Sequence, residues 1–277
     1  MATNSDKINP PTIDPPPHEP PRQDPPPKEP PEKDPPAKEP PVKEPGTPDQ
    51  EKRAAARASL QFVRDGQIVG LGTGSTAALA IQYLGERVRQ GLKIIGIPTS
   101  QRSKELAESL AIPLATFDDY QQIDVTIDGA DEFDPKLCLI KGGGGALLRE
   151  KVVASASKQV VIIVDSAKQV KVLGKFPLPV EVIPFAQALI AERISALGAS
   201  VVLRQYAYGN PFRTDEGHHI LDCHFGRIPD PPSLALQLSQ MPGIVEHGLF
   251  IDMADVVLVG KGTEVVELRR QHPRKQP

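Results

Sequence analysis

Charged side chains and glycines gather in one stretch of the sequence, residues 123–151. Asp128 and Asp131 follow one apolar run, and Lys141 follows another. Four consecutive glycines, Gly142–Gly145, come directly after the lysine. Carboxylates and amines are the side chains that move protons and balance developing charge in enzymes. The composition of this stretch therefore indicates a binding or catalytic site.

Solvated turn residues are the alternative explanation, because Asp and Gly are common in turns. The first apolar run reads as a buried strand, and ligands of open α/β sheets bind beyond the carboxyl ends of strands. Glycines lack a Cβ, so a ligand can approach their backbone, and the helix predicted from about Ala146 offers unpaired N–H groups to an anion. A flexible linker would also explain four glycines, but it seldom lies between an apolar strand and a helix with an apolar face.

A second glycine-rich turn comes earlier in the chain. Gly70, Gly72 and Gly74 lie between a predicted strand and a helix predicted from about Thr76, and Ser75 adds a hydroxyl. The helix N-terminus favours an anion, so the segment predicts a phosphate-binding turn. A dinucleotide-binding fold would use similar glycines, but the next apolar strand lacks the terminal acid that would hold a ribose hydroxyl.

These turns need a framework of strands and helices. Apolar strands alternate with amphipathic helices through residues 49–178, which predicts a mainly parallel sheet with helices on both faces. Residues 179–251 follow the order strand, helix, strand, strand, helix, strand, and about 252–268 return to the first sheet. The predicted fold class is α/β: a Rossmann-like domain with an inserted ferredoxin-like α+β domain.

Local signals add finer expectations. Asp49 is the expected N-cap of the first helix, and a short strand is expected near residues 115–117. The prolines of FPLPVEVIPF, residues 176–185, favour a connection or an edge strand. IVEHGLFI, residues 244–251, is expected to form one strand, and the basic residues beyond Glu267 a frayed end.

The N-terminal region has a different composition. Residues 14–43 contain three copies of a ten-residue, proline-rich repeat that begins with DPP. Such a segment cannot bury enough apolar surface to offset the entropy of ordering, so residues 1–48 are predicted to be a disordered tail, rich in polyproline II. A spacer or solubilising role is favoured; docking to an unidentified partner with an aromatic groove is the alternative.

Composition narrows the function classes. The first 50 residues carry a formal charge of −4 and the remainder +1, so neither part predicts a nucleic-acid surface. No stretch is long and apolar enough for a membrane span, and no export signal is recognised. Cys138 and Cys223 are the only cysteines, which suits a reducing compartment, so a cytoplasmic location is expected. His218, His219 and His224 lack partners at ligand spacing, and no metal site is expected.

Four segments of the chain closely resemble ribose-5-phosphate isomerase of the A type. They occur in the order of that family and at compatible spacing, and the resemblance covers roughly residues 50–268. The tail departs from the family, whose members usually begin near the first helix. The matching segments are GLGTGSTA (Gly70–Ala77), DGADE (Asp128–Glu132), KGGGGALLREK (Lys141–Lys151) and LGKFPLPVEVIPF (Leu173–Phe185).

The resemblance implies an aldose–ketose isomerase. Such an enzyme interconverts D-ribose 5-phosphate and D-ribulose 5-phosphate through an enediolate and needs no cofactor. The reaction belongs to the non-oxidative pentose phosphate pathway, and to the Calvin cycle in photosynthetic organisms. The family is commonly dimeric or tetrameric, so the resemblance also implies a homodimer or homotetramer, with the small domain as a natural assembly surface.

The resemblance also assigns roles to residues. Glu150 matches the general base, although its position between two basic residues would otherwise be interpreted as solvated. Asp128 and Asp131 are implied to hold sugar hydroxyls and assist ring opening, and Lys141 to counter the enediolate charge. The implied substrate-binding residues are Thr73, Gly74, Ser75 and Thr76 at the phosphate, Lys168 and Lys52 beside them, where exposed lysines are the alternative, and Gly129, Ala130, Gly142, Gly143 and Gly144 near the sugar.

Three competing functions remain at this stage. A sugar-phosphate sensor would share the fold, but it would normally carry a DNA-reading helix-turn-helix, which the tail cannot supply, and would have no need of Glu150. An amino-sugar phosphate deaminase or a coenzyme A transferase would lack this ordered combination of motifs. A nucleotide-dependent dehydrogenase is disfavoured by the missing ribose-binding acid.

Overall fold

The computed structural model describes residues 46–271 of the 277-residue chain. The proline-rich repeat and the last six residues lie outside this range, so the predicted tail and the predicted frayed end lie largely outside the described residues. No helix within residues 46–271 is long and apolar enough to cross a membrane.

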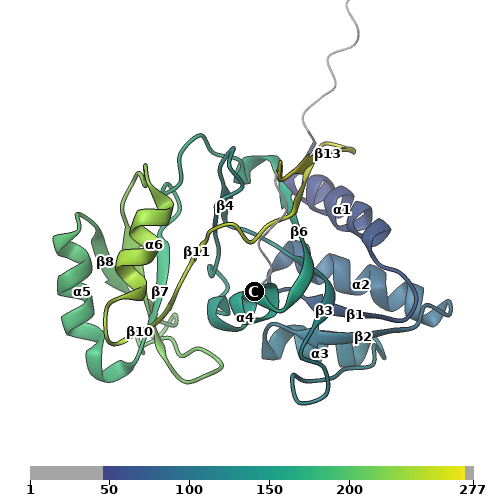
Figure 1. Ribbon diagram of the computed structural model, residues 1–277, viewed down its shortest axis with the longest axis horizontal. Helices are drawn as coiled ribbons and strands as arrows, with labels where there is room; N and C mark the ends of the chain where they lie inside the picture. The colour runs from purple at the N-terminus through teal and green to yellow at the C-terminus, as the bar shows by residue number, and fades with distance from the viewer. Residues whose placement is uncertain (1–45, 272–277) are drawn as a thin grey trace, which may run out of the picture. The chain divides into compact units, whose positions relative to one another are not determined.

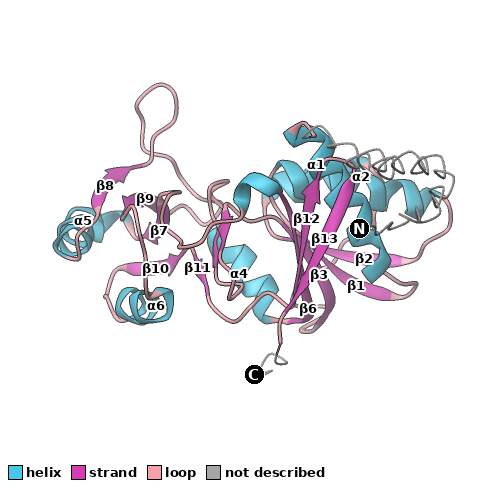
Figure 2. Ribbon diagram, turned by 90° about the horizontal axis from the view of Figure 1, so that it is seen from above, coloured by secondary structure: helices cyan, strands magenta, loops and turns pink. Residues whose placement is uncertain are grey.

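The larger of the three sheets has six strands (Figures 1 and 2). Five of its strands, β12, β6, β3, β1 and β2, run parallel to one another, and β13 pairs antiparallel with β12. The mainly parallel sheet predicted from the sequence is confirmed. In spatial order the strands are β13 (Glu264–Arg269), β12 (Val256–Lys261), β6 (Ser157–Asp165), β3 (Ile123–Asp128), β1 (Gln67–Leu71) and β2 (Ile94–Pro98).

Alternating side chains of β6 face two different cores, as the pleat of a strand requires. Val161 and Ile163 pack with α1, α2 and α3, whereas Val160 and Ile162 join the core that contains α4. The sheet is therefore covered on both faces, which explains the continuous apolar run of β6. The helices are α1 (Pro48–Ser59), α2 (Ser75–Arg89), α3 (Gln101–Ser109) and α4 (Leu147–Ser155).

The second sheet is antiparallel and has the strand order β10-β7-β9-β8. Two helices connect its strands in the ferredoxin-like order that the sequence predicts, and their apolar residues form a separate core with the sheet. The elements are β7 (Leu178–Val182), η3 (Pro184–Ala186), α5 (Gln187–Ala196), β8 (Ser200–Leu203), β9 (His219–His224), α6 (Pro231–Ser239) and β10 (Ile244–His247).

A three-stranded sheet lies between these two sheets (Figures 1 and 2). Its strands are short, and Phe133 and Phe250 are buried within it. Its order is β11-β5-β4, with β11 (Leu249–Phe250), β5 (Leu139–Ile140) and β4 (Glu132–Phe133).

Several local expectations were wrong. Thr47, not Asp49, caps α1, because its hydroxyl accepts the N–H of Gln50 in a capping box. Only an isolated bridge at Leu114 replaces the strand expected near residues 115–117. Residues 244–251 form two strands, β10 and β11, in different sheets.

Two further segments differ from expectation: one contains several prolines, and the other contains several basic residues. β7 is a central strand despite Pro179, which lies one position beyond the last residue that pairs with β10. The missing N–H is tolerated there, and the Pro179 carbonyl accepts the N–H of Gly248 at 2.7 Å. Residues up to Arg269 form the edge strand β13, because Val265 packs on the core beside β12.

Glu51 anchors α1 to the larger sheet. Its carboxylate is buried and accepts the N–H and the hydroxyl of Ser166, at 2.9 and 2.8 Å, and the N–H of Gly262 at 3.0 Å. Burial alone would raise the pKa of Glu51, but these hydrogen bonds outweigh it and lower the pKa. Because Lys52 is the next residue, this anchor also fixes where Lys52 points.

Glu51→Ala is expected to destabilise the fold by about 2–3 kcal/mol at neutral pH, because three part-buried donors lose a charged acceptor. The pKa of Glu51 is lowered on folding, so its contribution is present above the ordinary glutamate range and lost as the pH falls through the folded pKa. Urea unfolding at several pH values measures this. The matched control is Glu86→Ala, on the exposed face of α2; an equal effect of both variants would contradict the anchor.

Candidate active site

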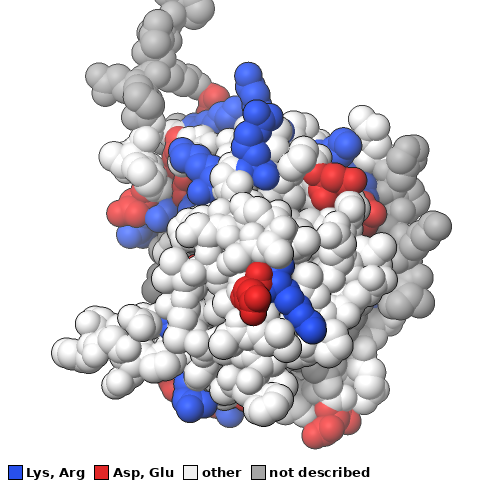
Figure 3. All heavy atoms as spheres, turned by 90° about the vertical axis from the view of Figure 1, so that its left-hand side faces the viewer, with Lys and Arg blue, Asp and Glu red and all other residues white. Residues whose placement is uncertain are grey.

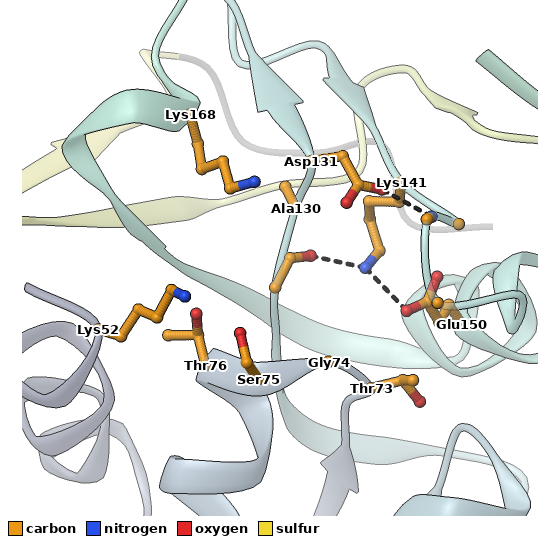
Figure 4. A pocket seen from close by; sticks show the side chains of 14 residues that line it. Lys52, Thr73, Gly74, Ser75, Thr76, Ala130, Asp131, Lys141, Glu150 and Lys168 are labelled. Atoms are coloured by element: carbon orange, nitrogen blue, oxygen red, sulfur yellow. Dashed lines mark hydrogen bonds and ion pairs between the residues drawn. The ribbon is translucent and has the colours of Figure 1, made fainter. Parts of the chain in front are cut away.

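A pocket lies at the carboxyl edge of the larger sheet, where β1, β3 and β6 end. The close-up of Figure 4 shows side chains from these three strand ends, from α1 and from α4 pointing into it. All but one of the site residues predicted from the sequence line this pocket; the exception is Asp128, which lies beneath it. The lining residues are Lys52, Thr73, Gly74, Ser75, Thr76, Gly129, Ala130, Asp131, Lys141, Gly142, Gly143, Gly144, Glu150 and Lys168.

One end of the pocket is built to hold an anion. Gly74 is the N-cap of α2 and has no side chain to occupy the free N–H groups of the first turn; its φ of 107° requires glycine. The hydroxyls of Ser75 and Thr76 lie at this turn, and the amines of Lys52 and Lys168 point toward it (Figure 4). Neither lysine forms an ion pair with a residue in the described part of the chain. This arrangement suits a phosphate group.

The opposite end contains two carboxylates around one lysine. Lys141 Nζ lies 2.9 Å from Asp128 Oδ2. It also lies 3.3 Å from Glu150 Oε1 and donates to the carbonyl of Gly129 at 2.6 Å (Figure 4). The three charged side chains are at most 5% exposed. Two negative charges therefore share one positive charge in a site with little water.

Both carboxylate oxygens of Asp128 have partners within the protein. Its Oδ1 accepts the N–H of Thr73 at 2.9 Å and the N–H of Gly129 at 2.7 Å, while its Oδ2 faces Lys141. The chain comes so close here that a Cβ on Gly72 would lie 2.2 Å from Asp128 Oδ1. Asp128 thus connects Lys141 with the phosphate-binding turn, and its predicted contact with sugar hydroxyls stays a prediction.

Glu150 has one oxygen free for a ligand. It lies in the first turn of α4, and although it is only 4% exposed, its Oε2 has no hydrogen-bond partner among the described residues. Burial raises the pKa of Glu150 to about 8; Lys141 opposes this rise, and Asp128 and Asp131 add to it. Burial would lower the pKa of Lys141, but the charges of Asp128 and Glu150 outweigh it and raise that pKa.

Asp131 and the glycine run complete this end. Asp131 Oδ2 accepts the N–H of Gly143 at 2.8 Å, which brings the glycine run against the turn that follows β3. Gly142 and Gly145 have φ values of 101° and 83°, in the region that favours glycine. The run can therefore fold tightly between β5 and α4 and present its backbone to the pocket.

Two residues beside this end were missed by the sequence analysis. The ring of Phe250 lies 5.3 Å from Lys141 Nζ and 4.9 Å from Lys151 Nζ, between two amines. Arg204 donates to the carbonyls of Gly142 and Gly143. Both come from segments far away in sequence, and nothing in their local sequence indicates the contact.

The histidines considered for a metal site have other contacts. His218 Nδ1 lies 2.9 Å from Glu181 Oε1, and His219 Nδ1 lies 2.6 Å from Gln187 Oε1. His224 is exposed at the end of β9. Within residues 46–271, no group of three or more His, Cys, Asp and Glu side chains has the arrangement of a metal site.

The chain is thus an α/β protein whose pocket has a helix N-terminus with hydroxyls and amines at one end and a buried lysine with carboxyl groups at the other. Residues 95–264 match the family model of ribose 5-phosphate isomerase A, also called phosphoriboisomerase A. The chain belongs to the ribose 5-phosphate isomerase A family.

Individual relatives agree with this assignment. The chain is 52% identical over 227 residues to ribose-5-phosphate isomerase A of Parvibaculum lavamentivorans, covering 79% of this chain and 98% of that protein. The identity to the protein of the same name from Ruegeria sp. is 55% over 229 residues, with 80% and 87% covered. A solved D-ribose-5-phosphate isomerase in complex with phospho-erythronic acid is 42% identical, with a TM-score of 0.78 and coverage of 80% of this chain and 99% of that one.

The neighbours of Glu150 are expected to shift its pKa in opposite directions. Lys141→Met should raise the pKa further, because the opposing positive charge is lost, and Asp131→Asn should lower it, because a negative charge is lost. NMR titration of protein labelled with ¹³C at the glutamate carboxyl measures both shifts. Asp230→Asn, at the N-cap of α6, is the control. Shifts of the same sign in the first two variants would contradict the described charge arrangement.

Proposed function

We propose that Glu150 is the base of an aldose–ketose isomerisation, the interconversion of D-ribose 5-phosphate and D-ribulose 5-phosphate. The observation that carries this proposal is the buried, unpartnered Oε2 of Glu150, a residue that lines the pocket together with the anion-binding turn. An isomerase of this kind moves one proton between two neighbouring carbons through an enediolate. A single carboxylate with a raised pKa can take up that proton and return it.

The phosphate of the substrate binds at the N-terminus of α2. Backbone N–H groups and the hydroxyls of Ser75 and Thr76 are the donors, and Lys52 and Lys168 supply positive charge. They contribute orientation, because a sugar held at its phosphate presents its other end to Glu150.

The negative charge of the enediolate develops beside Lys141. This amine is held between Asp128 and Glu150 and cannot turn away, so it is already in place when the charge forms. Asp128 positions Lys141, and Asp131, which lines the pocket, contacts the sugar hydroxyls and assists ring opening. The exposed backbone of Gly143 and Gly144 and the turn residues Gly129 and Ala130 surround the same oxygens.

The relatives support an enzyme over a sensor. The three relatives compared above carry the isomerase name, and one solved isomerase binds phospho-erythronic acid, a sugar acid phosphate. A carboxylate with two oxygens at its first carbon resembles a planar enediolate, which is the species that the lysine end of this pocket would stabilise. A sensor would have no use for a buried base with a raised pKa.

Glu150→Gln is expected to lower kcat by about 10²–10⁴-fold and leave KM almost unchanged, because the amide cannot accept the carbon-bound proton. Ser75→Ala should instead raise KM with a small effect on kcat. Steady-state kinetics with ribose 5-phosphate measures both, and Ser155→Ala on the exposed side of α4 is the control.

The pH dependence of the wild-type enzyme is a second test of Glu150 as the base. Because the base must be ionised, kcat/KM should rise with pH up to about the pKa of Glu150, near 8. An active Glu150→Gln enzyme, or a profile that falls through this range, would contradict the assignment.

We also propose two domains and an assembly surface. Residues 49–178 with about 252–268 form the catalytic domain, and residues 179–251 form the small domain with its own core.

The small domain carries exposed apolar side chains. Phe185 and Tyr208 are 98% and 95% exposed, and Leu189 and Val202 are about half exposed. Figure 3 shows this side of the molecule with few charged side chains. A second copy of the chain is the partner that we propose for it, in a homodimer or homotetramer.

Light scattering on the purified chain tests this assembly. The wild-type chain should have the mass of a dimer or tetramer, and Phe185→Glu should lower that mass, because a charge would be placed in the apolar surface. A wild-type chain with the mass of a monomer would contradict the proposal.

The cytoplasm is the compartment that we propose, since Cys138 and Cys223 are free and buried. Recovery of the chain in a secreted fraction would contradict this location.

A further inference from the structure

The segment between β8 and β9, residues 204–218, crosses from the small domain to the glycine run of the pocket. Asp215 accepts the N–H of Gln101 on α3 at 2.8 Å, and Glu216 pairs with Arg149 of α4 at 2.6 Å. At the other end of the segment, Arg204 and Phe212 contact the glycines themselves. The proposed function gives these two residues no role so far.

Arg204 is held rigidly before it reaches the glycine run. Its Nε and Nη2 donate to the two carboxylate oxygens of Asp222 on β9, at 2.9 and 2.5 Å, a bidentate pair. The remaining nitrogen, Nη1, donates to the carbonyls of Gly142 at 3.0 Å and Gly143 at 3.2 Å. The side chain of Arg204 is only 15% exposed.

These two contacts determine where the N–H groups of the glycine run point. In a trans peptide the C=O and N–H bonds point in opposite directions. The carbonyl of Gly142 faces Arg204, and the N–H of the same peptide, from Gly143, donates to Asp131 on the other side. The carbonyl of Gly143 also faces Arg204, so the N–H of Gly144 points away from the arginine.

The N–H of Gly144 is a free donor. No described residue accepts a hydrogen bond from it, and Gly144 is an exposed residue of the pocket lining. Phe212 limits the run from the same side as Arg204, because a Cβ on Gly145 would lie 2.5 Å from its ring. The run has one internal hydrogen bond, from the N–H of Gly145 to the carbonyl of Gly142 at 2.9 Å. Because glycine has the widest choice of backbone conformations, the contacts of Arg204 and Phe212 add to the restraint of this turn.

We propose that Arg204, held by Asp222, is a positioning residue that aims the Gly144 N–H into the pocket and the Gly143 N–H at Asp131. This inference rests on the proposed function and adds to it a backbone donor for the oxyanion that forms beside Lys141. Such a donor contributes only when it is fixed before the charge develops. Arg204 therefore acts on turnover through the backbone, without contact with the substrate.

The test compares Arg204→Met, Arg204→Lys and Asp222→Asn with Arg213→Met, an exposed arginine of the same segment. Kinetics with ribose 5-phosphate gives kcat and KM. Calorimetry gives the affinities for inorganic phosphate, which needs only the α2 turn, and for phospho-erythronic acid, which also needs the oxyanion end. Thermal unfolding of each variant shows whether the fold is retained.

Arg204→Met is expected to lower kcat about 10–100-fold, with less than a threefold change in KM. The affinity for phospho-erythronic acid should fall and the affinity for inorganic phosphate should stay. Arg204→Lys should recover part of kcat, because an amine can hold one carbonyl, and Asp222→Asn should lie between wild type and Arg204→Met. Arg213→Met should behave as wild type.

Two results would overturn the inference. One is a kcat of Arg204→Met and Asp222→Asn equal to that of Arg213→Met. The other is a parallel loss of affinity for phosphate and phospho-erythronic acid, which indicates general disruption of the pocket; if Arg204→Met fails to fold, Asp222→Asn decides. If the wild-type chain does not isomerise ribose 5-phosphate, the proposed function fails, while the two affinities still test how Arg204 positions the glycine run.

Discussion

The buried ion cluster of Lys141 with Asp128 and Glu150 is the constraint on which the rest of the pocket depends. One amine between two carboxylates in a buried site is stable only if each remaining oxygen has a donor or a ligand. Asp128 obtains its donors from the backbone of the two turns, whereas Glu150 keeps one oxygen without a partner. Asp128 is therefore fixed as a counter-ion of Lys141, whereas Glu150 keeps one oxygen that can take up a proton.

Support for this cluster comes from parts of the chain that never reach the pocket. Glu51 fixes the helix that carries Lys52, and Arg204 fixes the glycine run from the small domain. Lys151, next to the base, is buried on the other side of α4, where it donates to Glu246 at 2.6 Å and to the carbonyl of His247. Contacts of α1 and of the small domain thus hold the helices and the glycine run that line the pocket, and the pocket residues have little freedom to move independently.

Much of the fold and the pocket could be predicted from the sequence, because the signals are local. Strand periodicity gave the parallel sheet, glycines marked both turns, and charged residues at strand ends, together with the family motifs, gave the pocket lining. The positions of Arg204 and Phe250 could not be predicted, since each depends on a contact across many residues. The same applies to Pro179: composition favoured an edge, but the pairing of β10 ends one residue before the proline would interfere.

The pairing of β1 with β3 also bears on which sugar phosphates the pocket would accept. Its anion-binding turn follows β1, and Asp128, which contacts Lys141, ends β3; these strands are paired neighbours in register from Val69 with Val125 to Leu71 with Ile127. The anion-binding turn and the contact between Asp128 and Lys141 are therefore placed by two paired strands of the sheet. If a sugar phosphate is held at this turn with Glu150 as its base, a sugar with one carbon fewer or more would bring a different carbon to Glu150. The paired strands would then make the site selective for the length of the sugar.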